Sequence, residues 1–416
     1  MLRPPTIRLA FPPRLCDLRL ATCDRIDGPS RPDGSAVAGR GLQTLPRGAT
    51  GRHDRMSTRK GTEMGSAPPA IRIPADWDDV TAEWMTAALA AAFPGVKVRT
   101  ADLVLRDDGT NRRARFALSY IGEQGPPAVF VKAADPAHAK LNAMTGGLFN
   151  ETRLFSTGVQ LPLEHPAAYC ALMDEPTLDF VLVMEDVTIR GAEPRDATTP
   201  MNPDQAADAV RSLARLHSAF WGHRLNREDL AWVQPFAAWK GMHGIETGLR
   251  RVAETVPPAV RSLTGEQIEQ MWVTYVGTLT DGPQTLLHGD AHIGNTYTLP
   301  GNRAGFLDWQ VLRRGNHVID LGYFVQSALT VDDRRACESD LIDEYHRALD
   351  LPAEERPTRD GIWLRYRASV AHGLAIWMAT ASADGWQRPE VSIPLAQRYA
   401  AAYVDLDTAG ALDALA

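Results

Sequence analysis

The chain contains 416 residues, of which 44% are apolar, and its 44 Lys and Arg residues against 51 Asp and Glu residues give a formal charge of −7. This length accommodates two packed domains, and the apolar fraction excludes a wholly disordered protein. The longest nearly apolar run, residues 85–93, is much shorter than the roughly 18 residues that a membrane-spanning helix needs, so no membrane partner is expected. The four cysteines show no CxxC pairing or close clustering, which argues against a zinc site or a disulfide framework and favours a cytoplasmic protein.

Charge is unevenly distributed along the chain. Residues 1–64 hold 12 basic and 6 acidic residues, a charge of +6, whereas the remaining 352 residues hold 32 basic and 45 acidic residues, a charge of −13. The first segment is rich in Pro and Gly and has no sustained apolar period, so we expect residues 1–70 to be a disordered leader or the product of a mis-assigned start, with Met56 or Met64 as the true first residue. It lacks the apolar core of a secretory signal, and its mixed charges argue against a nucleic-acid-binding arm.

Residues 75–187 alternate between short β-like runs and amphipathic stretches, which predicts a small α+β lobe. Acidic residues and helical spacing predict a helix near 77–94, and a second helix is expected around 148–155. Between and after these helices, turn chemistry separates five expected strands at 96–105, 113–121, 128–134, 167–173 and 179–185.

Residues 188–416 are predominantly helical in pattern. Apolar residues recur at spacings of three and four, and strand-like pieces interrupt them only within 285–312. The expected architecture is therefore α+β, with a small sheet lobe followed by a larger helical lobe. The expected helices span 202–222, 264–281, 319–329, 332–349, 359–384 and 391–408.

The most informative stretch is LLHGDAHIGN, followed by GFLDWQ. His288, Asp290 and Asn295 match the spacing H-x-D-x-x-x-x-N of the protein-kinase catalytic loop, and Asp308 lies thirteen positions beyond Asn295, where a second metal ligand belongs. Phosphoryl transfer depends mainly on neutralising the phosphate charge, and Mg²⁺ takes hard oxygen ligands. Asn295 and Asp308 are therefore candidate metal ligands, and Asp290 is the candidate base that receives the proton of the acceptor hydroxyl.

Two upstream residues complete the pattern. Lys132, one of five lysines, lies on an expected strand, as does the lysine that holds nucleotide phosphates in kinases. Glu151 follows nineteen residues later on an expected helix and is its candidate ion-pair partner. Alone, each residue is typical of a solvated surface, but together with the loop 288–295 they indicate an ATP site.

These motifs resemble those of the aminoglycoside phosphotransferase and choline kinase superfamily, which has a protein-kinase-like fold. The stretches LVMED, LARLHSAFWG, FLDWQ and NHVIDLGYF are most similar to its ecdysteroid-kinase-like (CHK kinase-like) branch, and the resemblance covers about residues 75–410. It implies an ATP- and Mg²⁺-dependent kinase that phosphorylates the hydroxyl of a small molecule, hydrophobic in this branch. It also implies that the hinge that binds adenine contains Met184, Glu185 and Val187.

The chain departs from the protein-kinase pattern in the turn that covers the phosphates. Residues 107–111, DDGTN, contain a single glycine, where protein kinases have a glycine-rich loop. We expect backbone N–H groups and the side chains of Thr110 and Asn111 to contact phosphate oxygens instead.

Other polar residues near the loop have structural explanations. His288 and His292 are expected to hold the loop through hydrogen bonds to backbone carbonyls, and Asp320 either braces the loop or caps its own helix. The alternation of His288, Asp290 and His292 also fits a zinc or iron hydrolase, but that alternative leaves Asn295 and Asp308 unexplained.

Two further alternatives concern function. A degenerate kinase fold that only binds a nucleotide or small molecule is the principal non-catalytic alternative, although each expected catalytic residue is present. A nucleic-acid partner is not expected, because the body of the chain carries −13. Aromatic residues at helical spacing, expected in the core more often than in a pocket, would line an apolar acceptor pocket if they face a cavity: Phe220, Trp221, Trp363, Tyr366 and Trp377.

Overall fold

The structure, a computed structural model, describes residues 71–144, 146–238, 242–385 and 387–415. Residues 71–416 form one structural unit, and the expectation of a leader over residues 1–70 lies outside the described residues. Within the described part of the chain, no helix is both long and apolar enough to span a membrane.

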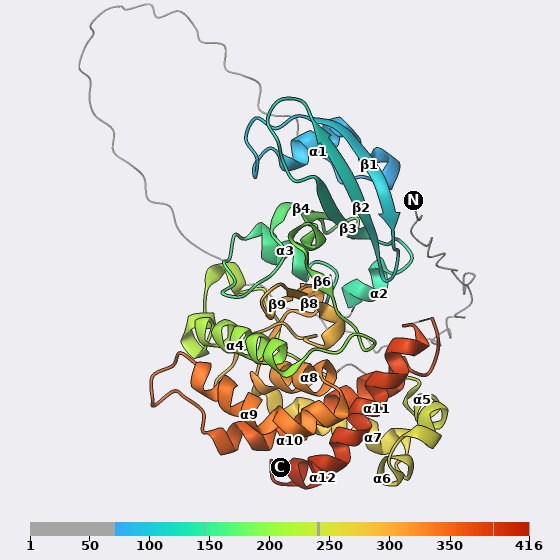
Figure 1. The fold of residues 1–416 in the computed structure, drawn as a ribbon, viewed down its shortest axis with the longest axis vertical. Coiled ribbons are helices and arrows are strands. Elements are labelled where there is room, and N and C mark those ends of the chain that lie inside the picture. The colour runs from blue at the N-terminus through green and yellow to red at the C-terminus, as the bar shows by residue number, and fades with distance from the viewer. Residues whose placement is uncertain (1–70, 145, 239–241, 386, 416) are drawn as a thin grey trace, which may run out of the picture. The chain divides into compact units, whose positions relative to one another are not determined.

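An antiparallel sheet of five strands forms the first part of this unit (Figure 1). Its spatial order is β1-β2-β3-β5-β4, and each expected strand is present within three residues of its predicted ends. The strands are β1 (Val98–Arg106), β2 (Asn111–Tyr120), β3 (Ala128–Ala134), β4 (Ala168–Asp174) and β5 (Asp179–Glu185).

The two faces of the sheet differ because successive side chains of a strand point in opposite directions. One face packs Phe116 and Val131 against Met85 of helix α1 (Ala82–Leu89). The other face carries the side chains of Arg113 of β2 and Lys132 of β3, which are paired in register. This second face therefore carries the candidate ATP lysine.

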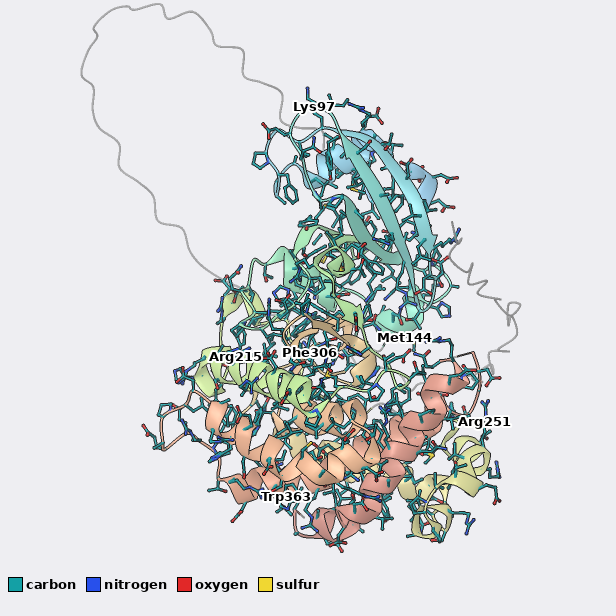
Figure 2. The ribbon with its side chains drawn as sticks, in the orientation of Figure 1. Lys97, Met144, Arg215, Arg251, Phe306 and Trp363 are labelled. Carbon is teal, nitrogen blue, oxygen red and sulfur yellow. The ribbon has the colours of Figure 1, made fainter. Side chains whose placement is uncertain are left out.

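Two short helices, α2 (Ala139–Met144) and α3 (Asn150–Ser156), connect β3 to β4. The helix α3 contacts β4 on one side and the 3₁₀ turn Trp309–Val311 on the other. Sequence analysis missed α2. Its last residue, Met144, is 85% exposed (Figure 2). By contrast, Phe306, at the end of strand β9 (Arg303–Phe306), is fully buried.

The rest of the chain is mainly helical and surrounds a second, larger apolar core. Asn202 caps the N-terminus of helix α4: it forms a capping box with Gln205 and precedes Pro203, the first helical residue. Every residue of α8 is buried, so this helix forms the centre of the helical part. The helices are α4 (Pro203–Ala219), α5 (Ile245–Val252), α6 (Pro258–Arg261), α7 (Gly265–Gly277), α8 (Val318–Ala328), α9 (Val331–Ala348), α10 (Arg359–Thr380), α11 (Pro389–Asp405) and α12 (Thr408–Asp413).

Short strands flank the loop of residues 288–295 and the segment that contains Asp308. Strand β7 (Thr285–Leu287) pairs with β10 (Arg313–Gly315), and β8 (Thr296–Leu299) pairs with β6 (Glu193–Pro194) and with β9. The predicted strand pieces correspond to β7 and β9. Sequence analysis missed β6, β8 and β10, and also α5, α6 and α12, because elements this short show little periodicity.

The expected α+β architecture, with a small antiparallel sheet followed by a larger helical part, is confirmed. The position of the boundary between lobes, expected at residues 187 and 188, stays a prediction.

Candidate active site

Strand β7 leads directly into the loop that begins at His288. The imidazole Nε2 of His288 donates to the carbonyl of Leu307 over 3.0 Å, and its Nδ1 accepts the N–H of Asp290 over 3.3 Å. Gly289 has a φ of +81°, and a Cβ at this position would lie 1.9 Å from the carbonyl oxygen of Val311, so only glycine fits. Burial lowers the pKa of His288, although nearby Asp320 opposes the change. A neutral His288 therefore fixes the loop to the segment that carries Asp308.

Asp320, in the first turn of α8, braces the same loop. Its Oδ2 accepts the N–H of His288 over 2.7 Å, and its Oδ1 accepts the N–H of Gly289 over 2.9 Å. The N-cap position of α8 is His317, which makes no capping bond with its side chain. Of the two roles expected for Asp320, the geometry therefore supports bracing rather than capping.

Three buried residues that sequence analysis missed extend this brace. His217 of α4 donates from Nε2 to Asp320 over 3.3 Å, because a carboxylate can only accept. The hydroxyl of Tyr345 lies 2.7 Å from His217 Nδ1 and 2.9 Å from His317 Nδ1. His217 and His317 lie within two of the motifs that carry the family resemblance, which was the available sequence signal. Tyr345 had none.

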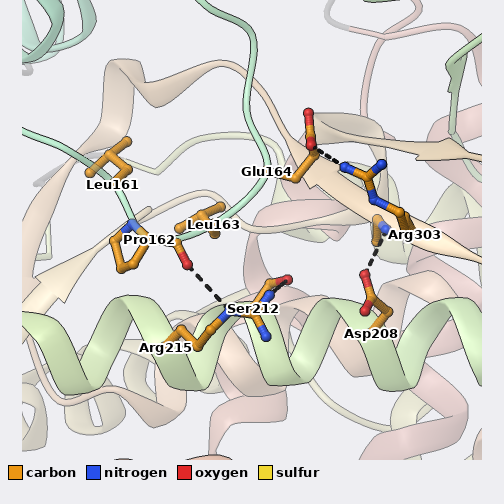
Figure 3. A pocket seen from close by; sticks show the side chains of 9 residues that line it. Leu161, Pro162, Leu163, Glu164, Asp208, Ser212, Arg215 and Arg303 are labelled. Atoms are coloured by element: carbon orange, nitrogen blue, oxygen red, sulfur yellow. Dashed lines mark hydrogen bonds and ion pairs between the residues drawn. The ribbon is translucent and has the colours of Figure 1, made fainter. Parts of the chain in front are cut away.

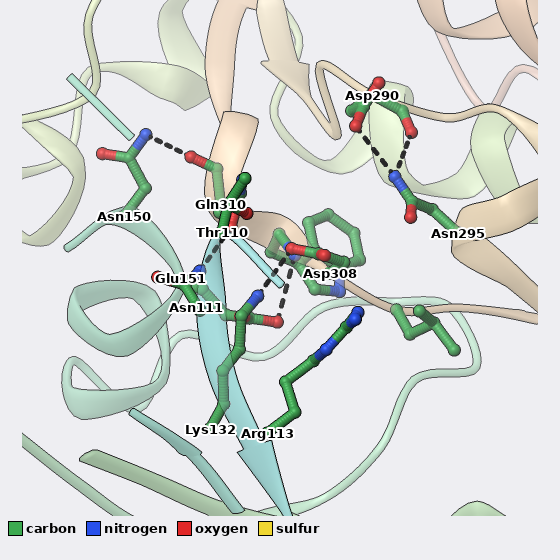
Figure 4. Close-up of polar contacts among 12 residues, drawn as sticks. Thr110, Asn111, Arg113, Lys132, Asn150, Glu151, Asp290, Asn295, Asp308 and Gln310 are labelled. Atoms are coloured by element: carbon green, nitrogen blue, oxygen red, sulfur yellow. Dashed lines mark hydrogen bonds and ion pairs between the residues drawn. The ribbon is translucent and has the colours of Figure 1, made fainter. Parts of the chain in front are cut away.

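Asp290 and Asn295 contact each other across the loop (Figure 4). Asn295 donates from Nδ2 to the backbone carbonyl of Asp290 over 2.8 Å and to its Oδ2 over 2.9 Å. These bonds turn the Asn295 Oδ1 outward, and no described residue donates to it. Burial raises the pKa of Asp290 to about 6; His288 opposes this shift, and the charge of Asp308 adds to it. A carboxyl with this pKa is well suited to accept a proton near neutral pH.

His292 holds the loop differently from the prediction. Its Nδ1 accepts the N–H of Gly294 over 3.0 Å and so caps the 3₁₀ turn Ile293–Asn295, whereas a bond to a backbone carbonyl was expected. The expectation was wrong because this turn presents its free N–H groups, not its carbonyls, to the residue before it. Burial lowers the pKa of His292 to about 4.

The alternative of a zinc or iron hydrolase is disfavoured, because backbone groups occupy both ring nitrogens of His288, which are then not available to bind a metal ion.

Lys132 joins the sheet to the segment after β9 (Figure 4). Its Nζ lies 2.7 Å from Glu151 Oε2 and 2.7 Å from Asp308 Oδ1. The N–H of Trp309 donates to the other oxygen of Glu151 over 3.1 Å. Burial acts to raise the pKa of Asp308, but the charge and hydrogen bond of Lys132, together with the charges of His288 and Arg113, lower it. The carboxylate next to Lys132 is therefore ionised at neutral pH.

Asn295 and Asp308 lie at the two ends of one β-hairpin. Asn295 directly precedes β8, Asp308 follows β9, and the strands pair with Thr296 opposite Phe306. Asp308 has a φ of +64°, a strained conformation for a residue other than glycine. No described residue donates to its Oδ2. An outward amide oxygen and a free carboxylate oxygen are the donor set that Mg²⁺ prefers, so these residues fit the expected ion.

The turn over the phosphates is tied to this segment. Asn111 donates from Nδ2 to Gln310 Oε1 over 2.8 Å and is 5% exposed. Asn142 donates to the Thr110 carbonyl over 3.0 Å, and the Thr110 side chain is exposed. The structure therefore places Asn111 against the residues around Asp308, while Thr110 lies on the surface of the turn.

The expected hinge follows the end of β5. Met184 and Val187 are buried, and Val187 begins a 3₁₀ turn whose other residues are exposed. The N–H of Glu185 donates to the carbonyl of Ala167 over 2.8 Å, so this donor is already used. Adenine contacts by these three residues stay a prediction.

Glu164, which sequence analysis missed, contacts both strands of the β8–β9 hairpin and forms, with Arg190, Tyr297 and Arg303, a cluster that we call the Glu164 hub. Its Oε1 lies 2.7 Å from Arg190 Nη2 and accepts the Tyr297 hydroxyl over 2.9 Å, while its Oε2 lies 2.6 Å from Arg303 Nη2. Arg190 also binds Glu185 over 2.6 Å. Glu164 lines a polar groove of about 570 Å³ beside α4 (Figure 3). The hub therefore links the expected hinge to the hairpin.

The aromatic residues considered for an acceptor pocket are packed in the larger core. Four of them are at most 4% exposed, and Trp363 packs against the same cluster: Phe220, Trp221, Tyr366 and Trp377.

The chain is similar to a known protein family and to several solved structures. The family model described as "Phosphotransferase enzyme family" matches residues 152–358. No curated protein matches the sequence. Similar solved structures include the choline kinase LicA from Streptococcus pneumoniae, 13% identical with a TM-score of 0.41, which covers 78% of this chain and 98% of its own. A macrolide 2′-phosphotransferase type I is 16% identical with a TM-score of 0.42 and the same coverage. The amicoumacin kinase hAmiN, solved with AMP-PNP and Ca²⁺, is 13% identical with a TM-score of 0.43, and the match covers 72% of this chain and 86% of that chain.

Proposed function

Because residues 152–358 match the family model described as "Phosphotransferase enzyme family", we propose that the chain transfers the γ-phosphoryl group of ATP to a hydroxyl of a small molecule. The observation that carries this proposal is the contact of Lys132 with both Glu151 and Asp308, opposite a loop in which Asp290 contacts Asn295. Lys132 would hold nucleotide phosphates, and Glu151 would keep its ammonium group in position.

The transfer requires one bond to form and one to break. The acceptor oxygen attacks the γ-phosphorus, the bond between this phosphorus and the bridging oxygen of ADP breaks, and Asp290 takes the hydroxyl proton. Bound Mg²⁺, held by Asn295 and Asp308, would supply neutralisation of the phosphate charge. His288, His292 and Asp320 would keep Asp290 at the position where this proton is released.

The proposed acceptor is a hydroxylated small molecule. The resemblance of LVMED and NHVIDLGYF to the CHK kinase-like branch favours an apolar acceptor.

The test is ADP release from ATP and Mg²⁺ across a panel of hydroxylated compounds, from choline and aminoglycosides to sterols. Asp290→Ala should abolish turnover of any accepted compound while nucleotide affinity changes little. Asp281→Ala, an exposed aspartate four residues before β7, is the matched control and should retain full turnover. Undiminished turnover in Asp290→Ala would refute the mechanism. ATP binding without turnover of any compound would favour the binding-protein alternative.

A further inference from the structure

Arg113 of β2 lies beside the proposed ATP lysine. The β2–β3 register pairs Arg113 directly with Lys132, so both side chains leave the sheet on the same face. Figure 4 shows the two side chains extending from neighbouring strands toward the segment of Asp308. The positive charge of Arg113 also acts on the Asp308 carboxylate. Arg113 is therefore a second cation on the face of the sheet that would receive nucleotide phosphates.

The guanidinium of Arg113 is held in place but not fully used. Its Nε donates to the carbonyl of Asp107 over 2.9 Å, and its Nη2 lies 3.0 Å from Asp107 Oδ2. Gly109 leaves room for it, because a Cβ there would approach Nη2 to 3.1 Å. No described residue accepts a bond from Nη1, and the side chain is 36% exposed. A preoriented guanidinium with a free donor loses little conformational freedom when it binds an anion.

The turn itself offers few donors to a phosphate. Gly109 already donates its N–H to the carbonyl of Asn111, and Asp107 donates its N–H to the carbonyl of Arg113, each over 2.9 Å. Asp107 and Asp108 add negative charge that would repel phosphates. The ammonium group of Lys132 is shared by two carboxylates, Glu151 and Asp308. The carboxylates around the site therefore outnumber the cations named so far, and a further cation close to the phosphates would reduce the repulsion.

We propose that Arg113 binds the β- and γ-phosphates of the nucleotide through Nη1, in place of the glycine-rich backbone that covers them in protein kinases. This inference rests on the proposed function. Arg binds phosphate oxygens through strong, charge-assisted hydrogen bonds, so a single side chain compensates for several weaker backbone donors.

The test is calorimetric titration of the full chain with Mg²⁺·ADP, Mg²⁺·AMP-PNP and AMP. Arg113→Ala should weaken ADP and AMP-PNP binding by about 10- to 100-fold and leave AMP affinity nearly unchanged. Arg113→Gln keeps a polar side chain for Asp107 but removes the charge, and it should show the same selective loss if the alanine variant folds poorly. Circular dichroism and thermal melts report on folding.

Arg106→Ala is the matched control. Arg106 forms an ion pair with Asp108 in the same turn, but it is paired with Ala114, which points to the opposite face of the sheet. This variant should bind all three nucleotides normally. Unchanged ADP affinity in a folded Arg113→Gln protein would overturn the inference, as would an equal loss for AMP, which indicates a merely structural role. Wild-type protein that binds no nucleotide would instead overturn the proposed function and this inference with it.

Discussion

The carboxylate of Asp320 accepts the backbone N–H of His288 over 2.7 Å, although 32 residues separate them in the sequence. The same carboxylate accepts the N–H of Gly289, so both peptide groups before Asp290 are fixed by one side chain at the start of α8. The orientation of Asp290 therefore depends on a helix whose residues are all buried.

Asp320→Asn should therefore reduce kcat much more than it raises KM. The substituted amide presents an NH₂ group to one of two N–H donors, which removes a charge-assisted bond worth about 1.5–3 kcal/mol. Steady-state kinetics and urea denaturation measure the two effects. Asp332→Asn, 95% exposed in the first turn of α9, is the control and should change neither. A normal kcat in Asp320→Asn would show that the loop keeps its shape without this brace.

Lys132→Met should destabilise the protein, because Glu151 and Asp308 then face each other without their shared cation. We expect the free energy of unfolding to fall by about 3 kcal/mol, the cost of breaking a buried ion pair. The double variant Lys132→Met with Glu151→Gln should recover much of this loss, yet neither protein should turn over ATP. Lys97→Met, at an exposed lysine, is the control. A double variant as unstable as the single one would contradict the pairing of Lys132 with Glu151.

The pH dependence of kcat/KM should show an acid limb near pH 6. Burial raises the pKa of Asp290 to about 6, with His288 opposing the shift, and only the ionised carboxylate accepts a proton. Activity should thus be lost as pH falls through about 6, whereas an ordinary aspartate with a pKa of about 3.9 would remain active at pH 5. Initial rates from pH 5 to 8, with thermal melts as the folding control, decide between the two. A flat profile down to pH 5 would refute Asp290 as the base.

Glu164→Gln should raise the Mg²⁺ concentration required for half-maximal turnover. Glu164 contacts Tyr297, two residues after Asn295, and Arg303, five residues before Asp308. Loss of its charge weakens both contacts and loosens the hairpin between the proposed ligands. A Mg²⁺ titration of activity measures the change, and Glu123→Gln in the exposed β2–β3 turn serves as the control. Equal Mg²⁺ requirements in both variants would leave Glu164 with only a structural role.

The sequence predicted the features that depend on local pattern. The five strands of the sheet and the long helices follow from periodicity and turn chemistry, and His288, Asp290 and Asn295 follow from spacing within eight residues. The structure also brings Lys132 and Glu151 together, as their order suggested. The brace by His217 and Tyr345 has no local signature, because its members are 128 residues apart and meet only through the packing of α4 against α9.

Other hydrogen-bond partners could not be predicted from the sequence, because several candidate groups lie within reach of the same side chain. His292 was expected to bond to a carbonyl but caps a 3₁₀ turn, a choice that depends on the backbone conformation of a few residues. Glu164 lies in an irregular segment, where no period indicates which side chains converge. Its partners are Arg190, in the turn after β5, and Tyr297 and Arg303, in the β8–β9 hairpin.

Asn295 and Asp308 lie at the two ends of a β-hairpin, so the number of residues between them does not determine how far apart they are in the structure. Strand pairing of Thr296 with Phe306 sets the distance between the two ends, whereas residues 300–302 only close the far turn. Insertions or deletions at this turn can therefore lengthen or shorten the interval between the two residues without moving either one. A search for related enzymes that demands a fixed interval here would reject chains with an intact site, so the paired strand ends are the better criterion.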